Sequence, residues 1–232
     1  LHICDLKINK TNIFFIDYFL SINNFNIIFT TFCILVFLNG SNFIDGVNTN
    51  LTLYNIIILT SLANYQFYFD LKLLLIILST FCLFNFFGKC FLGDNGVYVI
   101  SILTSFIVIS MININYLNPF IALNLLWYPA FENLFSIIRR YINNDKLDKA
   151  DKKHLHTLLY LSINKYKISS SVSNSLSGLI INFYNFTLIF LSMKFINNNQ
   201  LLFLILIINI FVYVITYLKL LNNFKNLSDS NA

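Results

Sequence analysis

The chain has 232 residues, of which 57% are hydrophobic and 11% charged, with a formal net charge of +5 and a mean hydropathy of +0.72. Soluble domains carry about 25% charged residues, so this composition, with its 26 phenylalanines, excludes a soluble globular protein. We expect a membrane protein, because stretches of roughly 20 mostly apolar residues, long enough to cross a bilayer, fit into the chain several times.

Seven apolar segments follow one another along the chain. Their apolarity is continuous rather than alternating, which favours helices over the strands of a membrane barrel. The second and third are short for a full span and are separated by a tight turn near Asp70. The segments are 25–38, 51–69, 71–87, 97–117, 119–138, 176–196 and 201–221. The sequence therefore predicts an all-α, polytopic membrane helix bundle with about seven transmembrane helices, and residues 1–232 form a single integral membrane domain.

The basic residues are distributed unequally between the two sides of such a bundle. With seven spans, the loops 39–50, 88–96 and 139–175 share one side with the tail, and most lysines and both arginines fall there. Four lysines fall on the other side, namely Lys7, Lys10, Lys72 and Lys194. The positive-inside rule places the three loops in the cytoplasm, with 139–175 as a basic cytoplasmic loop. This surplus favours lipid or phosphate partners and no nucleic acid.

The first polar constellation follows the first apolar segment. Asn39, Asn42 and Asp45 recur at three-residue spacing, which aligns them on one face at a helix end. Gly46 then permits a chain reversal and the close approach of a ligand. Taken by itself, the pattern also fits a polar helix cap followed by a turn.

The second constellation is the tight loop Gly93-Asp94-Asn95-Gly96. Proteins hold Mg²⁺ through one or two carboxylates while substrate phosphates complete the coordination shell, and Asp94 is suited to that role. A plain turn between two membrane helices would show the same residues.

The third constellation extends from Arg139 and Arg140 to His154 and His156. Its basic surplus attracts diphosphate or lipid headgroups, and the two histidines could donate to phosphate oxygens or shuttle protons. Alternatively, it is a basic membrane anchor without a ligand. Parity places all three constellations on one side, where together they match the needs of a Mg²⁺–diphosphate site.

Glu132 is a separate signal inside the segment 119–138, three residues after Pro129. A carboxylate at membrane depth is costly unless it faces a partner or a water-filled cavity. A structural partner within the bundle, such as an arginine near the cytoplasmic end, and a substrate role are both open.

These segments resemble, in order and approximate spacing, the polyprenyl-phosphate sugar-1-phosphate transferases, a family that includes undecaprenyl-phosphate N-acetylglucosamine-1-phosphate transferase and phospho-N-acetylmuramoyl-pentapeptide transferase. The family signatures read N-x-x-N-x-x-D-G-x-[DN]-G-L, then K-x-F-[ML]-G-D-x-G-S, then an arginine pair followed by A-D-[RK]-x-H-[IL]-H-H. The matching residues are Asn39, Asn42, Asp45, Gly46 and Asn48; Lys89, Phe91, Leu92, Gly93, Asp94 and Gly96; and Arg139, Arg140, Ala150, Asp151, Lys152, His154, Leu155 and His156.

The resemblance implies a function. The expected reaction transfers a sugar-1-phosphate, of the N-acetylhexosamine class, from a UDP-sugar to undecaprenyl phosphate and releases UMP. It would be the first membrane step of a cell-envelope glycan such as peptidoglycan or lipopolysaccharide. The implied location is the bacterial inner membrane with cytoplasmic active-site loops, and a homodimer is compatible with the family.

The resemblance also implies roles for individual residues. Asp94 would ligate Mg²⁺, or Mn²⁺ in its place, and Phe91 would stack on the uracil ring. The catalytic set is then Asp94, Asp45, His154 and His156, and the substrate-binding set is Asn39, Asn42, Gly46, Asn48, Phe91, Arg139 and Arg140.

The chain departs from the family pattern at several positions. Thr49 and Asn50 stand where the family usually has Gly-Leu, Val97 replaces Ser, and Thr157 replaces the last His. The family's adjacent Asp-Asp pair, which acts on the lipid phosphate, has no counterpart here. We therefore expect the C-terminal portion of a longer enzyme, inactive by itself. The alternatives are a non-catalytic relative that binds lipid phosphate or UDP-sugar without turnover, and an unrelated transporter or channel subunit.

Overall fold

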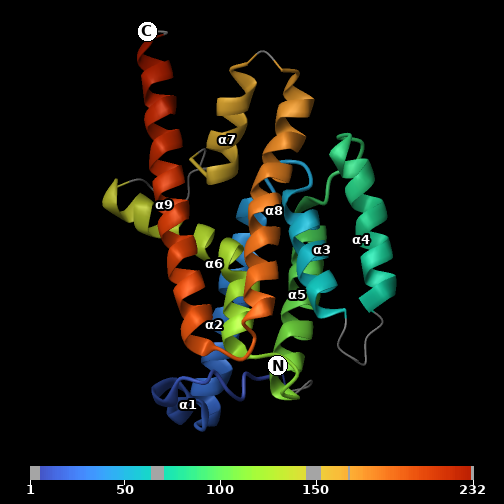
Figure 1. Cartoon of the computed structure of the whole chain (residues 1–232), viewed down its shortest axis with the longest axis vertical. Helices are drawn as coiled ribbons and strands as arrows, with labels where there is room; N and C mark the ends of the chain where they lie inside the picture. The colour runs from blue at the N-terminus through green and yellow to red at the C-terminus, as the bar shows by residue number, and fades with distance from the viewer. Residues whose placement is uncertain (1–5, 64–70, 145–152, 167, 231–232) are drawn as a thin grey trace.

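The computed structural model describes residues 6–63, 71–144, 153–166 and 168–230, the last six of them by their backbone alone. All regular secondary structure in these residues is helical (Figure 1). The helices are α1 Phe14–Leu20, α2 Asn23–Ile44, α3 Asn50–Leu62, α4 Leu71–Phe86, α5 Gly93–Asn113, α6 Pro119–Ile142, α7 Leu155–Asn164, α8 Ser170–Lys194 and α9 Asn199–Ser230.

Five of these helices are long and apolar enough to cross a membrane: α2, α5, α6, α8 and, over Asn199–Phe224, α9. The prediction of a multi-pass helical membrane protein is thereby confirmed. Helices α3 and α4 are apolar but have only 13 and 16 residues, fewer than the roughly 20 of a full span. The predicted segment 51–69 is longer than α3, and residues 64–70 lie outside the described residues.

The helix boundaries change the description of two predicted loops. Helix α2 continues past residue 38 to Ile44, so Asn39 and Asn42 lie on a helix and Asp45 is its C-cap. The region 139–175 is not one irregular loop, because α6 continues to Ile142, α7 occupies Leu155–Asn164 and α8 begins at Ser170. Residues 145–152 of this region, including Asp151, lie outside the described residues.

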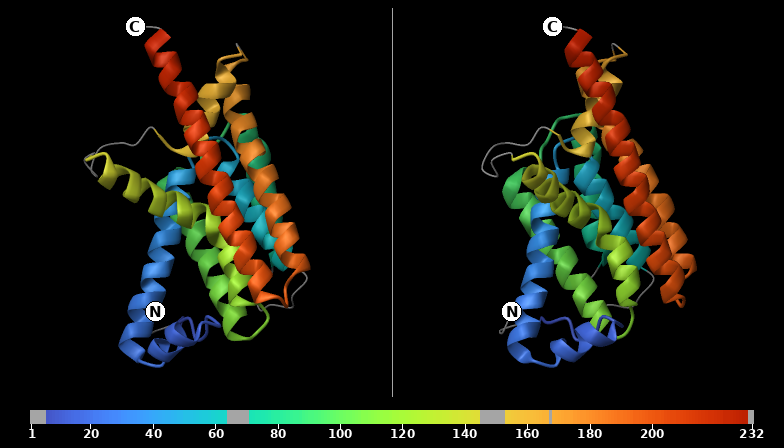
Figure 2. Two further views of the ribbon diagram at one scale, coloured as in Figure 1. Left: turned by 60° about the vertical axis from the view of Figure 1, so that its left-hand side comes forward. Right: turned by 90° about the vertical axis from the view of Figure 1, so that its left-hand side faces the viewer.

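Successive long helices run in opposite directions, so the termini of different helices meet at the two ends of the bundle (Figures 1 and 2). The C-terminal ends of α2, α4 and α6 and the N-terminal ends of α3, α5 and α8 lie together, and we call this the loop end. At the opposite end, the segment before α1 contacts the end of α5, since the Asn9 N–H donates to Asn113 Oδ1 (3.1 Å). This arrangement agrees with the parity deduced from the sequence.

Helices α2 and α6 pack with their backbones in close contact. A Cβ atom added to Gly40 of α2 would lie 2.0 Å from the Pro129 carbonyl oxygen of α6, so only glycine allows this approach. Small residues at helix crossings are the usual means of close packing in membranes, where no hydrophobic effect drives helices together.

Pro129 lies inside α6 and interrupts its hydrogen bonding. Proline has no N–H, so the carbonyl of Leu125, four residues earlier, loses its helical donor. The hydroxyl of Tyr54 on α3, which is fully buried, donates to this oxygen at 2.7 Å. Helix α6 bends along its length, and its C-terminal part turns aside from the bundle axis (Figure 2). The bend places the last turns of α6, with Glu132 and Arg139, beneath the loop end.

Amide side chains link the long helices at membrane depth. Each link joins two helices by a buried hydrogen bond, of a kind worth on average about 0.6 kcal/mol in membrane proteins. The links include Asn182 to the Asn50 carbonyl oxygen (2.9 Å), Thr104 to Asn55 (2.7 Å), Trp127 to Asn185 (3.1 Å) and Asn124 to the Leu202 carbonyl oxygen (3.0 Å). The abundance of asparagine in apolar segments therefore has a structural use.

Replacing Tyr54 with phenylalanine should destabilise the bundle. The substitution keeps the packing but leaves the Leu125 carbonyl without a donor, a loss of about 1–3 kcal/mol for a buried polar group. Thermal or denaturant unfolding in detergent measures this change. Tyr98→Phe on α5 is the control, because Tyr98 is 39% exposed. Equal unfolding temperatures for the two variants would contradict the assignment.

Candidate functional site

The loop end brings the three polar constellations of the sequence together. Asn42, on the last turn of α2, donates through Nδ2 to Asp94 Oδ1 on the first turn of α5 (3.2 Å). This bond joins the first constellation to the second across 52 residues of sequence. Helix α5 starts at Gly93, whose φ of 66° favours glycine, and the unpaired N–H groups of its first turn suit the carboxylate of Asp94.

Asp45 lies close enough to Asp94 to be affected by its charge. Burial, and secondly the negative charge of Asp94, raise the pKa of the Asp45 carboxyl from 3.8 to about 7. Asp94 is exposed, so this pair offers one open and one half-buried carboxylate at the same edge. Within the described ranges, no group of three or more His, Cys, Asp or Glu residues could hold a metal ion. A cation here would therefore need substrate oxygens or water as further ligands.

The third constellation meets the first at Gly46. A Cβ atom added to Gly46 would lie 2.0 Å from Nε2 of His156, so the absence of a side chain admits the imidazole. His156 is 3% exposed and stacks on His154, with ring centroids 5.6 Å apart and planes at 5°. The histidine pair is thereby fixed next to the Asp45–Gly46 turn.

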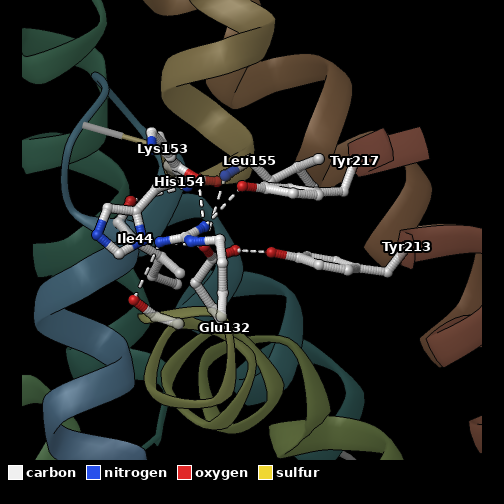
Figure 3. Close-up of polar contacts among 10 residues, drawn as sticks. Ile44, Glu132, Lys153, His154, Leu155, Tyr213 and Tyr217 are labelled. Atoms are coloured by element: carbon white, nitrogen blue, oxygen red, sulfur yellow. Dashed lines mark hydrogen bonds and ion pairs between the residues drawn. The ribbon is translucent and has the colours of Figure 1, made fainter. Parts of the chain in front are cut away.

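Glu132 supports the histidine pair from below (Figure 3). Its side chain is fully buried; Oε1 lies 2.9 Å from His154 Nδ1, and Oε2 accepts a 2.6 Å hydrogen bond from the hydroxyl of Tyr213 on α9. The Leu155 N–H also points to Oε1 (3.4 Å). The alternatives left open for Glu132 are thus decided in favour of structural partners, which are a histidine and a tyrosine. Through His154, the carboxylate sets the position of the whole stack.

The Arg139 side chain is buried among protein contacts and is not accessible to a ligand. Its guanidinium is 8% exposed and donates to the Lys153 carbonyl oxygen (2.5 Å) and to Tyr217 (2.9 Å), with Cζ 5.5 Å from the Tyr217 ring centroid. The contact to Lys153 holds the backbone directly before His154. Arg139 therefore supports the histidine segment, and Arg140, which is half-buried, is the more open of the two predicted phosphate-binding arginines.

Asn48 also faces the protein interior. Its N–H donates to Asn174 Oδ1 (2.6 Å) and its Nδ2 to Ser175 Oγ (3.3 Å), and it is 8% exposed. These bonds fasten the turn after Asp45 to the start of α8. The structure therefore favours a structural role for Asn48 over contact with a substrate. By contrast, Asn39 is exposed and Phe91 is 75% exposed, so both remain accessible to a ligand at the loop end.

Thr49 occupies a backbone conformation that favours glycine. Its φ is 66°, in the left-handed region that a β-branched residue enters rarely. The N–H donates to Asn85 Oδ1 (2.5 Å), and the hydroxyl is buried without a hydrogen-bond partner among the described residues. The glycine of the resembled signature at this position thus has a physical reason, and threonine adopts the same turn under strain.

Asn50, the second departure from the transferase signature, is hydrogen-bonded to another asparagine. Asn50 is fully buried, and its Nδ2 donates to the Ile44 carbonyl oxygen (2.8 Å) while its Oδ1 accepts from Asn182 of α8 (3.2 Å). The polar side chain in the place of leucine is therefore satisfied.

Sequence reasoning missed several side chains that hold the site in place: Tyr213, Tyr217, Asn85, Asn174 and Ser175. The tyrosines are spaced i, i+4 in the last apolar segment, which places both hydroxyls on one face of α9. That spacing was visible in the sequence, whereas the pairing of Asn85 with the backbone of Thr49 depends on the fold.

Comparison with known proteins finds no matching family model, no similar curated protein and no similar solved structure. The five long apolar helices define a multi-pass membrane protein.

Replacing Thr49 with glycine should stabilise the protein by about 1 kcal/mol. The left-handed conformation costs residues other than glycine roughly 1–2 kcal/mol, and the change relieves this cost. Glycine also makes the unfolded chain more flexible, which lowers the gain by roughly 0.4–1 kcal/mol. In addition, the change removes a buried hydroxyl. Thr49→Ala is the matched control, because it removes the hydroxyl and the γ-methyl but retains the Cβ. Unfolding temperatures in detergent decide the matter, and stabilisation by alanine as large as by glycine would argue against backbone strain.

Proposed function

We propose that this chain provides the nucleotide-sugar site of a membrane enzyme that transfers a sugar-1-phosphate from a UDP-sugar to a polyprenyl phosphate such as undecaprenyl phosphate. One observation carries the proposal: residues from three separate signature segments lie together at one end of the bundle. They are Asn42 and Asp45 from the first segment, Asp94 from the second and His156 from the third. The donor class we favour is a UDP-N-acetylhexosamine.

The residues present fit a divalent cation. Asp94 is an exposed carboxylate, Asp45 lies near enough for its pKa to respond to Asp94, and hard cations are held by one or two such groups together with phosphate oxygens. Mg²⁺, or Mn²⁺, held by Asp94 would neutralise the diphosphate of the donor. Asn42 would keep the Asp94 carboxylate oriented through its 3.2 Å bond.

The chain's other side chains would bind and orient the donor. The exposed ring of Phe91 is free to stack on uracil, and the exposed amide of Asn39 can bond to the nucleotide. His156 is 3% exposed and lies against the Asp45–Gly46 turn, so its imidazole would hold that turn in place beside the donor. Glu132 and Tyr213 hold His154, and through it His156, in one orientation.

The proposed topology has seven spans. Helices α3 and α4 pack against each other and run in opposite directions (Figure 1), so the pair returns the chain to the side it left and all three loops stay on one side. The positive-inside rule then makes the loop end cytoplasmic, as a UDP-sugar donor requires, and the bacterial inner membrane is the proposed location. A homodimer is compatible with this arrangement.

A second candidate function is binding of a UDP-sugar without transfer. The adjacent Asp-Asp pair of the resembled enzymes is absent from residues 1–232, and Thr157 stands in the place of a histidine. Such a protein would retain the donor site at the loop end and have no turnover.

The transferase proposal is tested with the complete gene product in membranes. Radiolabel from a UDP-N-acetylhexosamine should enter solvent-extractable lipid only with Mg²⁺ or Mn²⁺. Asp94→Asn should lower the rate by roughly 10²–10³, the usual effect of removing one electrostatic stabiliser of the transition state. Asn95→Ala, in the same exposed turn, should stay near wild type.

Two other results have definite meanings. Full activity of Asp94→Asn would contradict the assignment of Asp94 as the cation ligand. Saturable UDP-sugar binding without any lipid product, in the complete wild-type protein, would favour the binding protein over the enzyme.

The Asp45 carboxyl should make cation binding depend on pH near 7. Because its pKa in the folded state is raised from 3.8 to about 7, the protonated form stabilises the fold at low pH, and that contribution is lost as the pH rises through 7. Without a divalent cation, the unfolding temperature should therefore fall between pH 5 and pH 8. Mg²⁺ should restore the unfolding temperature at pH 8 and change it little at pH 5. In Asp45→Asn, both the fall with pH and the stabilisation by Mg²⁺ at pH 8 should be absent. Equal stabilisation by Mg²⁺ at pH 5 and pH 8 would contradict the prediction.

A further inference from the structure

A polar pocket lies at the end of the bundle opposite to the site, and an apolar groove extends from it along the helices. The groove has a volume of about 370 Å³ and lies between the segment before α1 and helices α2, α5, α6 and α9. The pocket has a volume of about 230 Å³ and lies where α5 ends and α6 begins. Lys10, Ile112 and Pro119 line both, so the groove and the pocket are continuous.

The groove has the lining expected for a hydrocarbon chain. Apart from Lys10, Thr11, Cys33 and Ser105, its lining residues are apolar. Its lining on α2 extends from Phe29 to Phe37, about 12 Å at 1.5 Å per residue, which is close to the roughly 15 Å hydrocarbon depth of one leaflet. Its volume falls within the roughly 300–1,000 Å³ of ligand sites.

The adjoining pocket has the lining expected for a polar headgroup. Asn12, Asn115, Asn118 and Asn197 surround it, and Lys10 stands where it meets the groove. Lys10 is exposed and has no ion pair among the residues that the structure describes. Asp17, the acid near this rim, accepts two 2.6 Å hydrogen bonds from the N–H and hydroxyl of Thr11.

We propose that this composite site binds one anionic phospholipid, with its phosphate at Lys10 and one acyl chain in the groove. The charge of Lys10 complements the phosphate, and the amides of Asn115 and Asn197 can donate to ester and headgroup oxygens. The lipid lies at the end opposite to Asp94 and His156, so it is neither the nucleotide sugar nor the phosphate of the acceptor. Its acyl chain would lie along the groove that α2, α5 and α6 line.

The chain contains a built-in probe of the groove. Trp127 is the single tryptophan of the chain, and it lines the groove. Phospholipids with brominated acyl chains quench tryptophan on contact. The full chain reconstituted in phosphatidylcholine vesicles can therefore be titrated with brominated phosphatidylglycerol or with brominated phosphatidylcholine, and Trp127 emission recorded.

Brominated phosphatidylglycerol should reach half-maximal quenching at a mole fraction about fivefold lower than brominated phosphatidylcholine, the factor that corresponds to about 1 kcal/mol per lysine at an anionic surface. Lys10→Gln should remove that preference. Lys194→Gln is the matched control, because it removes a charge at the same end without lining either cavity, and the preference should persist. Ala130→Leu, which narrows the groove without changing charge, should reduce quenching by both lipids.

Three outcomes would overturn the proposal. Equal quenching by the two lipids in the wild type would remove the anionic preference. A preference that survives Lys10→Gln would remove the headgroup site. Protection of Trp127 by added polyprenyl phosphate, independent of Lys10, would assign the groove to the acceptor's tail. None of these results depends on transferase activity, so the lipid site and the proposed function can fail separately.

Discussion

The arrangement of this bundle depends on the contact between Gly40 of α2 and Pro129 of α6. The glycine lets the two backbones meet, and the proline bends α6 at the same level. The Tyr54 hydroxyl supplies the hydrogen bond that the bend removes. Beyond the bend, α6 carries Glu132 to the histidine pair, and the same helix lines the apolar groove from Pro119 to Leu134, on both sides of the bend. One crossing point therefore shapes both ends of the molecule.

The site is held mainly by polar bonds between helices that are distant in sequence. Asn42 to Asp94, Asn48 to Asn174 and Glu132 to His154 each join different elements. The Glu132–His154 bond is buried and the Asn48–Asn174 bond is partly buried, so water competes little for them and an unpaired donor there would be costly. The structure thus distinguishes accessible residues, such as Asp94 and Phe91, from residues that fix the surrounding backbone, such as Asn48 and Arg139.

Much of this could be predicted from sequence, for physical reasons. Long apolar runs must be helical in a bilayer, so the positions of α2, α5, α6, α8 and α9 followed from hydropathy, and parity placed the three constellations at one end. For the short helices α3 and α4, it was harder to predict whether they cross the membrane, because length alone does not decide this. The inward orientation of Asn48 and Arg139, and the pairing of Glu132 with His154, depend on side-chain directions around the bend of α6. Those directions are fixed by tertiary packing, which spacing in the sequence does not record.

The two tyrosines of α9 attach that helix to the residues that hold the histidine pair. Tyr213 bonds to Glu132 and Tyr217 to Arg139, so the longest apolar helix of the described chain is attached to the base of the site. The depth and tilt of such a helix respond to the thickness of the surrounding hydrocarbon. A thinner or thicker membrane that tilts α9 would then move the two hydroxyls relative to α6, and the histidines with them. Membrane thickness is thereby coupled to the geometry of a site that lies outside the hydrocarbon.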